Sequence, residues 1–384
     1  MKEDFNALRL KHHGDTAMMF DILQRECRYK CSSKLHETLK CETFIFPSLA
    51  VAEMATSDDA AKIHASMIDD GENVLDMTCG LGIDTFHISR KADKVTSIEL
   101  NHDAYTAAIH NVKALGLNNV EIIEGDSVEW LKAKDIKYDT IFIDPARRDS
   151  TGRHFALKDC RPDIIENIEL LLCHCKKLII KASPMIDITK ACKELPAICK
   201  TVVIGTVKEC KEVMFICKGE IGKSSEEGNC NRVSSITIGK ERFSFSHSDE
   251  QNITPRYITE DIIPGAWIYE PYPSVMKGGG FNSLSQQFNL GRLYTNTNLF
   301  YSTKPQPGFP GKTFEIIEIL HFDKQSIKEF AKRYPKINVA TRNFPLSAPE
   351  LAQKLKVEEG GDKMVFGAIG PKGKKSLIVT SMGQ

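Results

Sequence analysis

The stretch from residue 74 to residue 85 constrains the fold of this chain more than any other segment. An apolar pair, Val74-Leu75, ends in Asp76, and a loop that contains Gly80 and Gly82 leads into a helix-like pattern. In an open α/β sheet, ligands bind where the carboxyl ends of strands meet the following loops. The two glycines permit tight turns and let a ligand approach the main chain closely. The stretch therefore predicts a ligand site within an α/β fold.

Residues 73–218 alternate between strand-like and helix-like patterns. The predicted strands are 73–76, 94–99, 120–124, 140–144, 178–182, 201–206 and 213–217, and the predicted helices are 85–92, 103–115, 128–132, 162–174 and 188–195. Strands that alternate with helices imply a mostly parallel sheet covered on both faces. The last two strands are separated only by residues 207–212, which is too short for a parallel crossover, so the last strand should be antiparallel.

Carboxylates mark the ends of successive predicted strands: Asp76, Glu99, Asp126 and Asp144. This order suits a sulfonium cofactor, whose amino-acid part, ribose and adenine need separate contacts. Asp76 and the 80–82 backbone suit the amino-acid part, and Glu99 suits the ribose because a carboxylate accepts two hydroxyl hydrogen bonds. A dinucleotide-binding domain is the main rival, but its third fingerprint glycine is replaced by Thr85.

The 74–85 stretch resembles motif I of the class I S-adenosylmethionine-dependent methyltransferases, whose sheet has seven strands with one reversed near the end. The resemblance implies a Rossmann-like α/β core with S-adenosylmethionine as cofactor. It also implies a cofactor pocket built from Thr56, Asp76, Thr78, Gly80, Gly82, Asp84, Thr85, Glu99, Leu100, Asp126 and Ser127. Thr56 or Ser57 is in addition expected to cap a helix that leads toward the motif.

Residues 142–149, Phe-Ile-Asp-Pro-Ala-Arg-Arg-Asp, end the fourth predicted strand. Asp144-Pro145 resembles the Asp/Asn-Pro-Pro-aromatic motif of methyltransferases that act on exocyclic amines, with Ala146 and Arg147 in place of the second proline and the aromatic residue. The resemblance implies that Asp144 and the carbonyl group of Pro145 orient an amino group. Arg147 and Arg148 are predicted to bind substrate phosphate or stack on a base, with salt bridges to neighbouring acids as the structural alternative.

The segment at the end of the fifth predicted strand bears on two other methylation reactions, at uracil C5 and at the ribose 2′-oxygen. RNA uracil-5-methyltransferases carry a nucleophilic cysteine in Ser-Cys-Asn-Pro, and the cysteine position here holds Ala182, which argues against a covalent pyrimidine mechanism. Ribose 2′-O-methyltransferases use a Lys-Asp-Lys-Glu tetrad, onto which Asp144 and Lys181 would fall. The other members would be Lys62 and either Glu209 or Glu212. Lys181 is therefore a third candidate catalytic residue, and a lysine that simply extends its ammonium to solvent is the alternative.

The C-terminal segment carries a second resemblance. Residues 338–347, Asn-Val-Ala-Thr-Arg-Asn-Phe-Pro-Leu-Ser, and Gly-Gly-Asp at 360–362 precede a predicted hairpin, 363–369 with 375–381. These segments resemble the THUMP-like domain that ends a family of bacterial class I methyltransferases with Asp-Pro-Ala-Arg-Arg at motif IV. Residues 308–384 hold thirteen Lys and Arg against eight Asp and Glu, which suits contacts with RNA phosphates. An RNA methyltransferase that modifies a base nitrogen is therefore the leading hypothesis, and an RNA-binding protein without catalysis is the alternative from another class.

Four domains are predicted: a helical N-terminal region at 1–65, the methyltransferase domain at 66–219, a small β-rich ferredoxin-like domain at 220–307 and the THUMP-like domain at 308–384. The formal net charge is zero, so any nucleic-acid surface must be local. The twelve cysteines form no paired zinc pattern, which predicts reduced thiols and no metal. With no apolar run of membrane length, a cytoplasmic protein without a membrane partner is expected, and the oligomeric state is left open.

Overall fold

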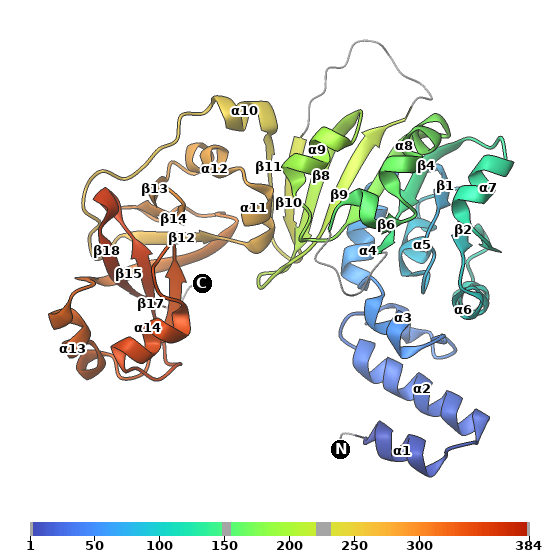
Figure 1. Cartoon of the computed structure of the whole chain (residues 1–384), viewed down its shortest axis with the longest axis horizontal. Coiled ribbons are helices and arrows are strands. Elements are labelled where there is room, and N and C mark those ends of the chain that lie inside the picture. Colours follow the sequence, from blue (N-terminus) through green and yellow to red (C-terminus); the bar gives the residue numbers. More distant parts are fainter. Residues whose placement is uncertain (1–2, 148–154, 220–231, 382–384) are drawn as a thin grey trace. The chain divides into compact units, whose positions relative to one another are not determined.

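The structure is a computed structural model that describes residues 3–147, 155–219 and 232–381 (Figure 1). Two compact units divide it, Met1–Cys199 with Val213–Asn229, and Lys200–Glu212 with Cys230–Gln384. Arg148, one of the two predicted phosphate-binding arginines, lies outside the described residues, and so does nearly all of the predicted boundary at 219–231. The boundaries between the four predicted domains stay predictions.

A mostly parallel sheet forms the core. Its first strands are β1 (Asn73–Asp76), β2 (Lys94–Glu99), β3 (Val120–Glu124), β4 (Tyr138–Ile143), β7 (Cys175–Ala182), β8 (Ile198–Gly205) and β9 (Cys210–Lys218). They follow the order β3-β2-β1-β4-β7-β9-β8. The pairs β1–β2, β1–β4, β2–β3 and β4–β7 are parallel, and β9 is antiparallel to β7. The predicted Rossmann-like class I core with one reversed strand is thus confirmed.

Helices connect the core strands: α5 (Ile83–Ile88), α6 (His102–Ala114), α7 (Ser127–Ala133), α8 (Ile164–Cys173) and α9 (Ile188–Glu194). Four of these helices, α6 to α9, begin after a short polar side chain that accepts hydrogen bonds from otherwise unpaired amides of the first turn. Asn101, Asp126, Asp163 and Asp187 act in this way for α6 to α9. Helix α5 is shorter than the predicted 85–92 and begins directly after Gly82. Two short strands, β5 (Ala146–Arg147) and β6 (Cys160–Arg161), pair after β4.

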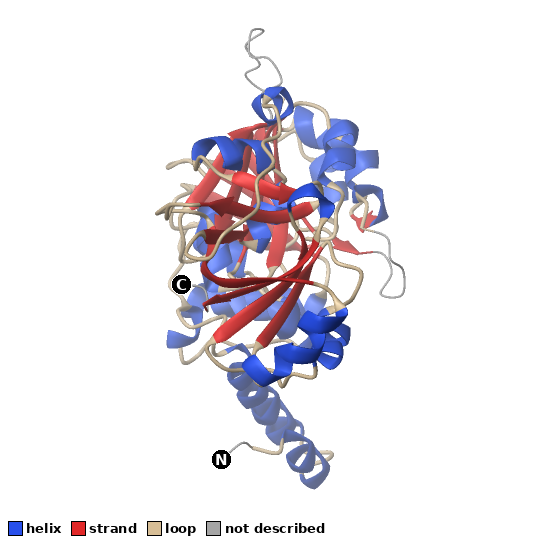
Figure 2. Cartoon of the chain, turned by 90° about the vertical axis from the view of Figure 1, so that its left-hand side faces the viewer, coloured by secondary structure: helices blue, strands red, loops and turns tan. Residues whose placement is uncertain are grey.

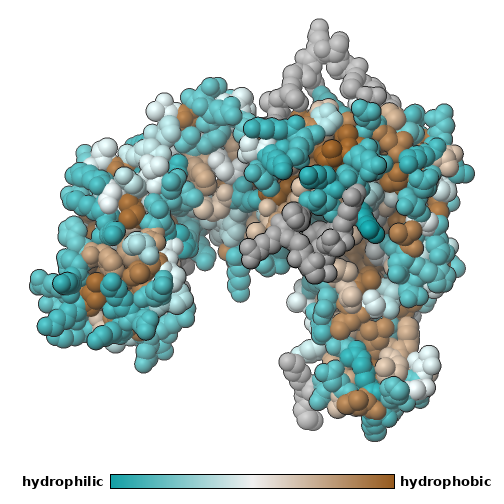
Figure 3. Space-filling view, viewed as in Figure 1, coloured by the Kyte–Doolittle hydropathy of each residue, from teal (hydrophilic) through white to brown (hydrophobic). Residues whose placement is uncertain are grey.

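The N-terminal region is helical as expected, with α1 (Phe5–Lys11), α2 (Thr16–Cys31), α3 (Leu49–Met54) and α4 (Asp58–Ala65). A shared cluster of buried side chains packs Phe44 and Phe46 with Leu81 and Phe86 of the motif I segment. Buried Asn111 of α6 adds a two-way contact with the backbone of Ile45, at 2.9 and 3.0 Å. The surface of the N-terminal region shows apolar patches (Figure 3). Its exposed large apolar side chains include Leu10, Phe20 and Tyr29.

Strands β10 (Arg232–Thr237) and β11 (Arg242–Ser246) extend the core sheet, since β10 is parallel to β8 and antiparallel to β11. The sequence predicted both segments as strands of a small β-rich unit, and both belong to the second compact unit, together with the β8 residues 200–205 that pair with β10. Five consecutive residues of β10 are buried, which is typical of a strand covered on both faces. Helix α11 (Pro273–Gly278) covers β10 closely, because a Cβ at Gly278 would lie 2.5 Å from Ser235 Oγ.

A second sheet holds the C-terminal strands: β12 (Trp267–Pro271), β13 (Gly291–Tyr294), β14 (Thr297–Ser302), β15 (Gly311–His321), β16 (Asn338–Arg342), β17 (Lys363–Ile369) and β18 (Lys375–Ser381), in the order β13-β14-β12-β15-β18-β17-β16. The remaining helices are α10 (His247–Asn252), α12 (Phe281–Gln287), α13 (Lys324–Arg333) and α14 (Ala348–Leu355). Buried residues of α13 and α14, Phe330 and Leu351, pack on Val365 and Val379, so both helices cover the same face of the sheet (Figure 2). The predicted terminal hairpin is confirmed as β17–β18. In the described part of the chain, no helix is long and apolar enough to cross a membrane.

Candidate functional site

The loop between β1 and α5 combines a rigid glycine with an accessible one. Gly82 has φ +87°, and a Cβ there would lie 2.4 Å from the Phe86 ring, so only glycine fits without displacement. Gly80 has φ +57°, and no heavy atom lies within 4 Å of the position that its Cβ would take. The main chain at Gly80 is therefore open to a ligand, as the sequence led us to expect of a cofactor loop.

Asp76 is fully buried beneath this loop. Its carboxylate accepts hydrogen bonds from the Thr78 amide at 3.0 Å, from Ser97 Oγ at 3.1 Å and from the Thr85 hydroxyl. Burial raises the pKa of Asp76 to about 6, although the hydrogen bonds from Thr85 and Thr78 oppose the shift. Asp76 therefore anchors the loop by accepting hydrogen bonds from Thr78 and Thr85. Ser97, which sequence reasoning missed, is its register partner on β2.

Glu99, at the end of β2, is tied to the same loop. Its Oε2 accepts a hydrogen bond from the Gly80 amide at 2.7 Å, and its Oε1 accepts one from the Asn101 amide at 2.8 Å. A carboxylate has about four lone-pair directions, so both oxygens can still accept ribose hydroxyls. Leu100 follows with 71% of its surface exposed, and it offers an apolar face next to this carboxylate.

Asp126 lies at the end of the third strand, as predicted, and its Oδ1 caps α7 by accepting from the amides of Val128 and Glu129 at 2.8 and 3.1 Å. The side chain stays exposed, whereas Ser127 is buried. The capping contact fixes the direction of the carboxylate and leaves Oδ2 for a ligand. Open backbone at Gly80, an anchored strand-end carboxylate and an exposed leucine fit the three parts of S-adenosylmethionine.

Four predicted residues meet at the carboxyl ends of β4 and β7. Lys181 Nζ lies 2.7 Å from Asp144 Oδ2, 2.8 Å from Thr56 Oγ1 and 3.8 Å from Asp84 Oδ2. The Thr56 hydroxyl in turn donates to Asp84 Oδ2 at 2.6 Å. The Lys181 and Asp84 side chains are 11% and 12% exposed, whereas that of Asp144 is 41% exposed. The parallel register explains the first contact, because Ile143 pairs with Ile180 and the next residues are neighbours.

His64 on α4 completes this cluster from within the core. Its ring is fully buried, and Nδ1 lies 2.7 Å from Asp84 Oδ1. Burial opposes ionisation of Asp84, but Lys181 and His64 outweigh it and hold the pKa of this carboxyl well below its usual range. No local sequence pattern marks His64, since it lies twenty residues before Asp84 in a different helix.

The motif IV backbone is fixed beside the same loop. The Asp144 amide donates to Thr78 Oγ1 at 2.7 Å, which links the end of β4 to motif I. Pro145 follows directly, and Ala146 with Arg147 forms β5. Of the predicted 2′-O tetrad, the structure brings Asp144 and Lys181 together but pairs Lys62 with Glu37, because both side chains lie on the surface of the N-terminal region. Lys62 therefore has a different partner from the one that the tetrad would require.

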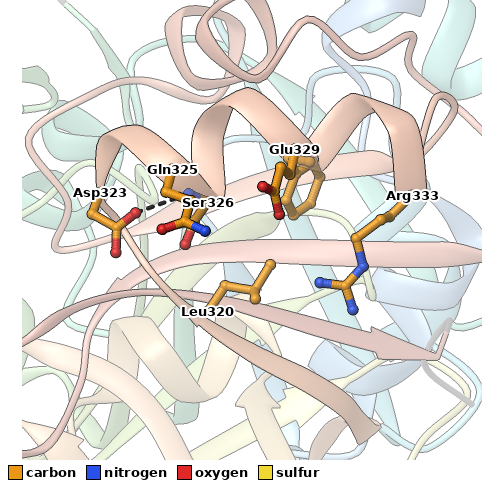
Figure 4. Close-up of a pocket in the computed structure, with 7 residues that line it drawn as sticks. Leu320, Asp323, Gln325, Ser326, Glu329 and Arg333 are labelled. Atoms are coloured by element: carbon orange, nitrogen blue, oxygen red, sulfur yellow. Dashed lines mark hydrogen bonds between the residues drawn. The ribbon is translucent and has the colours of Figure 1, made fainter.

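A shallow hollow of about 110 Å³ lies at α13 in the C-terminal region (Figure 4). It is lined by Leu320, Asp323, Gln325, Ser326, Glu329, Phe330 and Arg333. Ligand pockets for small molecules usually enclose about 300 to 1,000 Å³, so this hollow is too small for a cofactor or a nucleotide. No group of three or more His, Cys, Asp or Glu that could hold a metal ion is found among the described residues.

Comparisons with known proteins agree with this arrangement. A family model described as conserved hypothetical protein 95 matches residues 62–179, a ferredoxin-like domain matches 267–310 and a THUMP domain-like model matches 311–382. An RNA methyltransferase of Mycoplasma mobile, named as uncharacterised, is 39% identical over 77 residues, which are 20% of this chain and 21% of that protein. Ribosomal RNA large subunit methyltransferase K/L of Pseudomonas aeruginosa is 29% identical over 104 residues, 27% of this chain and 14% of that protein. The chain spans a quarter or less of the length of these curated relatives.

A solved structure matches almost the whole chain. A protein of Porphyromonas gingivalis W83, assigned as a methyltransferase, is 30% identical with a TM-score of 0.86, and the match covers 96% of this chain and 90% of that chain. This match, which covers nearly all of both chains, confirms the predicted family. The chain belongs to the family of class I S-adenosylmethionine-dependent methyltransferases that end in a THUMP-like domain.

Proposed function

We propose that this protein transfers the methyl group of S-adenosylmethionine to a nitrogen atom of an RNA base. The observation that carries the proposal is the position of Asp144, whose half-exposed carboxylate follows β4 and whose amide is tied to motif I through Thr78. A hydrogen-bond acceptor held in this place can align an amino group with the methyl donor. Transfer between aligned groups depends mainly on orientation and exclusion of water.

The cofactor would be held by residues whose geometry already suits it. The open backbone at Gly80 would meet its amino-acid part, Glu99 its ribose hydroxyls and Leu100 with Asp126 its adenine. Bound there, S-adenosylmethionine supplies an electrophilic methyl group. The protein contributes the orientation of the acceptor: Asp144 and the carbonyl oxygen of Pro145 would accept hydrogen bonds from the amino group and aim its lone pair.

RNA as the substrate rests on the names of the relatives and on the C-terminal region. The helix α13 carries Lys324, Lys328 and Lys332, all exposed and four residues apart, so they line one side of the helix. Arg342, one of the thirteen basic residues of the 308–384 segment, forms an ion pair with Glu270. The three lysines of α13 are therefore the better candidates for phosphate contacts. If they make three such contacts with a single strand, their removal lowers the salt slope of binding by about 2.

Two related chemistries are distinguished by single residues. A Xylella fastidiosa relative, 30% identical over 110 residues, is a 23S rRNA uracil-C5-methyltransferase. That chemistry needs a cysteine nucleophile where this chain has Ala182, so a covalent pyrimidine route is not proposed. Ribose 2′-O transfer is the second candidate, favoured by the 2.7 Å contact of Lys181 with Asp144. If the protein methylates a ribose 2′-oxygen, Lys181→Ala should abolish the transfer. If it methylates a base nitrogen, the same substitution should only weaken the transfer.

The decisive experiment compares modified nucleosides in total RNA from cells with and without this gene by mass spectrometry. A base-methylated nucleoside that is lost with the gene, and restored by the wild-type protein but not by Asp144→Ala, supports the proposal. Asp144→Asn should restore it in part, because an amide oxygen still accepts the hydrogen bond. An unchanged nucleoside profile refutes RNA as the substrate. A protein that binds RNA but gives no calorimetric signal with S-adenosylmethionine is an RNA-binding protein without catalysis.

A further inference from the structure

A polar relay runs from the buried core to the proposed catalytic carboxylate. His64 contacts Asp84 at 2.7 Å, Asp84 accepts from Thr56 at 2.6 Å, and Thr56 accepts from Lys181 at 2.8 Å. Lys181 also contacts Asp144 at 2.7 Å. The first member of the series, the His64 imidazole, is fully buried, and the last, the Asp144 carboxylate, is 41% exposed. Only its last member, Asp144, is well placed to touch a substrate.

We propose that Thr56 and Asp84 are positioning residues that hold the Lys181 ammonium against Asp144, and so fix the carboxylate that orients the acceptor. This inference rests on the proposed function and assigns to Thr56 and Asp84 a role other than contact with the cofactor. Thr56 belongs to the segment between α3 and α4, so the N-terminal region supplies a part of the site.

The hydrogen bonds support this assignment. Both oxygens of the Asp84 carboxylate already have partners inside the protein, Oδ1 with His64 and Oδ2 with Thr56 and Lys181. The Thr56 hydroxyl donates to Asp84 and accepts from Lys181, which uses its single proton. A buried ammonium next to two carboxylates and a hydroxyl is held in one direction, because each of these contacts restricts the orientation of the same side chain.

The protein contains a matched control for this relay. The same two helices, α4 and α5, carry a second Asp–His pair, in which Asp58 Oδ1 lies 3.0 Å from His87 Nε2. Asp58 and His87 are as deeply buried as His64. Asp58 contacts the amides of Glu37 and Thr38 at 2.7 and 3.0 Å and the Thr38 hydroxyl at 2.5 Å. Loss of this pair disturbs the same helix interface by the same chemistry, but these Asp58 contacts all lie outside the relay.

The test combines three measurements on the full-length protein with Thr56→Val, Thr56→Ser, Asp84→Asn and Asp58→Asn. The rate at which acetic anhydride modifies Lys181, measured by mass spectrometry, reports how firmly the ammonium is held, and it requires neither cofactor nor activity. Calorimetry gives the affinity for S-adenosylmethionine. Transfer of a radioactive methyl group to total RNA gives kcat and KM.

We expect Thr56→Val and Asp84→Asn to raise the modification rate of Lys181 about fivefold or more and to lower kcat about tenfold to a hundredfold, because misplaced catalytic groups cost this much. The Kd for S-adenosylmethionine and the KM for RNA should change less than threefold. Thr56→Ser keeps the hydroxyl and should behave as the wild type. Asp58→Asn should lower the thermal midpoint while Lys181 reactivity stays at the wild-type value.

Three results would overturn the inference: unchanged reactivity of Lys181 in Thr56→Val, an equal rise in Asp58→Asn, or a loss of cofactor affinity that parallels the loss of kcat. If Asp84→Asn does not fold, the Thr56→Val and Thr56→Ser pair still decides. A wild-type protein that methylates no RNA refutes the proposed function alone, because the Lys181 labelling then still tests the relay.

Discussion

The two glycines of motif I should respond to the same substitution to different extents. Gly82→Ala places a methyl group 2.4 Å from the Phe86 ring at φ +87°. The left-handed backbone costs about 1–2 kcal/mol for a residue with a Cβ. Forcing the ring aside costs about 1–3 kcal/mol more. Gly80→Ala at φ +57° meets no atom within 4 Å and should carry only the first cost.

Hydrogen exchange of the α5 amides, followed by mass spectrometry, measures this difference locally and avoids the unfolding of two separate units. The extra 1–3 kcal/mol corresponds to exchange about fivefold to 150-fold faster in Gly82→Ala than in Gly80→Ala. Affinity for S-adenosylmethionine should show a separate effect of Gly80→Ala, because its methyl group occupies the open space beside the main chain. Equal exchange rates in both variants, or a Gly80→Ala protein with unchanged cofactor affinity, would refute this account of the loop.

Three further predictions follow from buried or exposed single residues. The pKa of Asp76, raised to about 6, means that the folded state holds this proton more tightly than the unfolded state, so stability falls as pH rises from about 4 to about 6 and is level above. Asp76→Asn should abolish this fall, which amounts to about 2 kcal/mol between pH 4.5 and pH 7.5, and thermal midpoints compared at these two pH values measure it. Asn111→Ala leaves the Ile45 amide and carbonyl unpaired and should release the N-terminal region to limited proteolysis at a cost of about 2–4 kcal/mol, whereas intact resistance would argue against this contact. Leu100→Asp should weaken S-adenosylmethionine about tenfold in calorimetry with an unchanged thermal midpoint, since the side chain is exposed.

The local parts of the fold followed from the sequence because local chemistry decides them. The strands β1, β2 and β3 have the predicted bounds, since apolar runs end there at a carboxylate or a glycine turn. The later core strands begin two or three residues before the predicted starts. The additional residues include charged ones, such as Lys176 in β7 and Lys200 in β8. Polar side chains at a strand end leave the local pattern ambiguous, and pairing with neighbouring strands settles the length.

The assembly of the site was predictable only where strand register brings residues together. Asp144 and Lys181 end neighbouring parallel strands, so their contact follows from topology. Thr56 reaches Lys181 across 125 residues of sequence, and this contact depends on how the N-terminal helices pack. The contact of His64 with Asp84 and the pairing of β10 with β8 were not predicted for the same reason. Both depend on contacts between distant segments that no local pattern encodes.

The contact between the N-terminal segment and the motif I segment limits how this enzyme can be recombined with its relatives. The family model for the core begins at residue 62, which would be a natural crossover point for exchanging domains. A chimera joined there would lose Thr56 from the site and would expose Leu81 and Phe86, which Phe44 and Phe46 now cover. A chimera with a working core should therefore retain the chain from α2 onward together with that core.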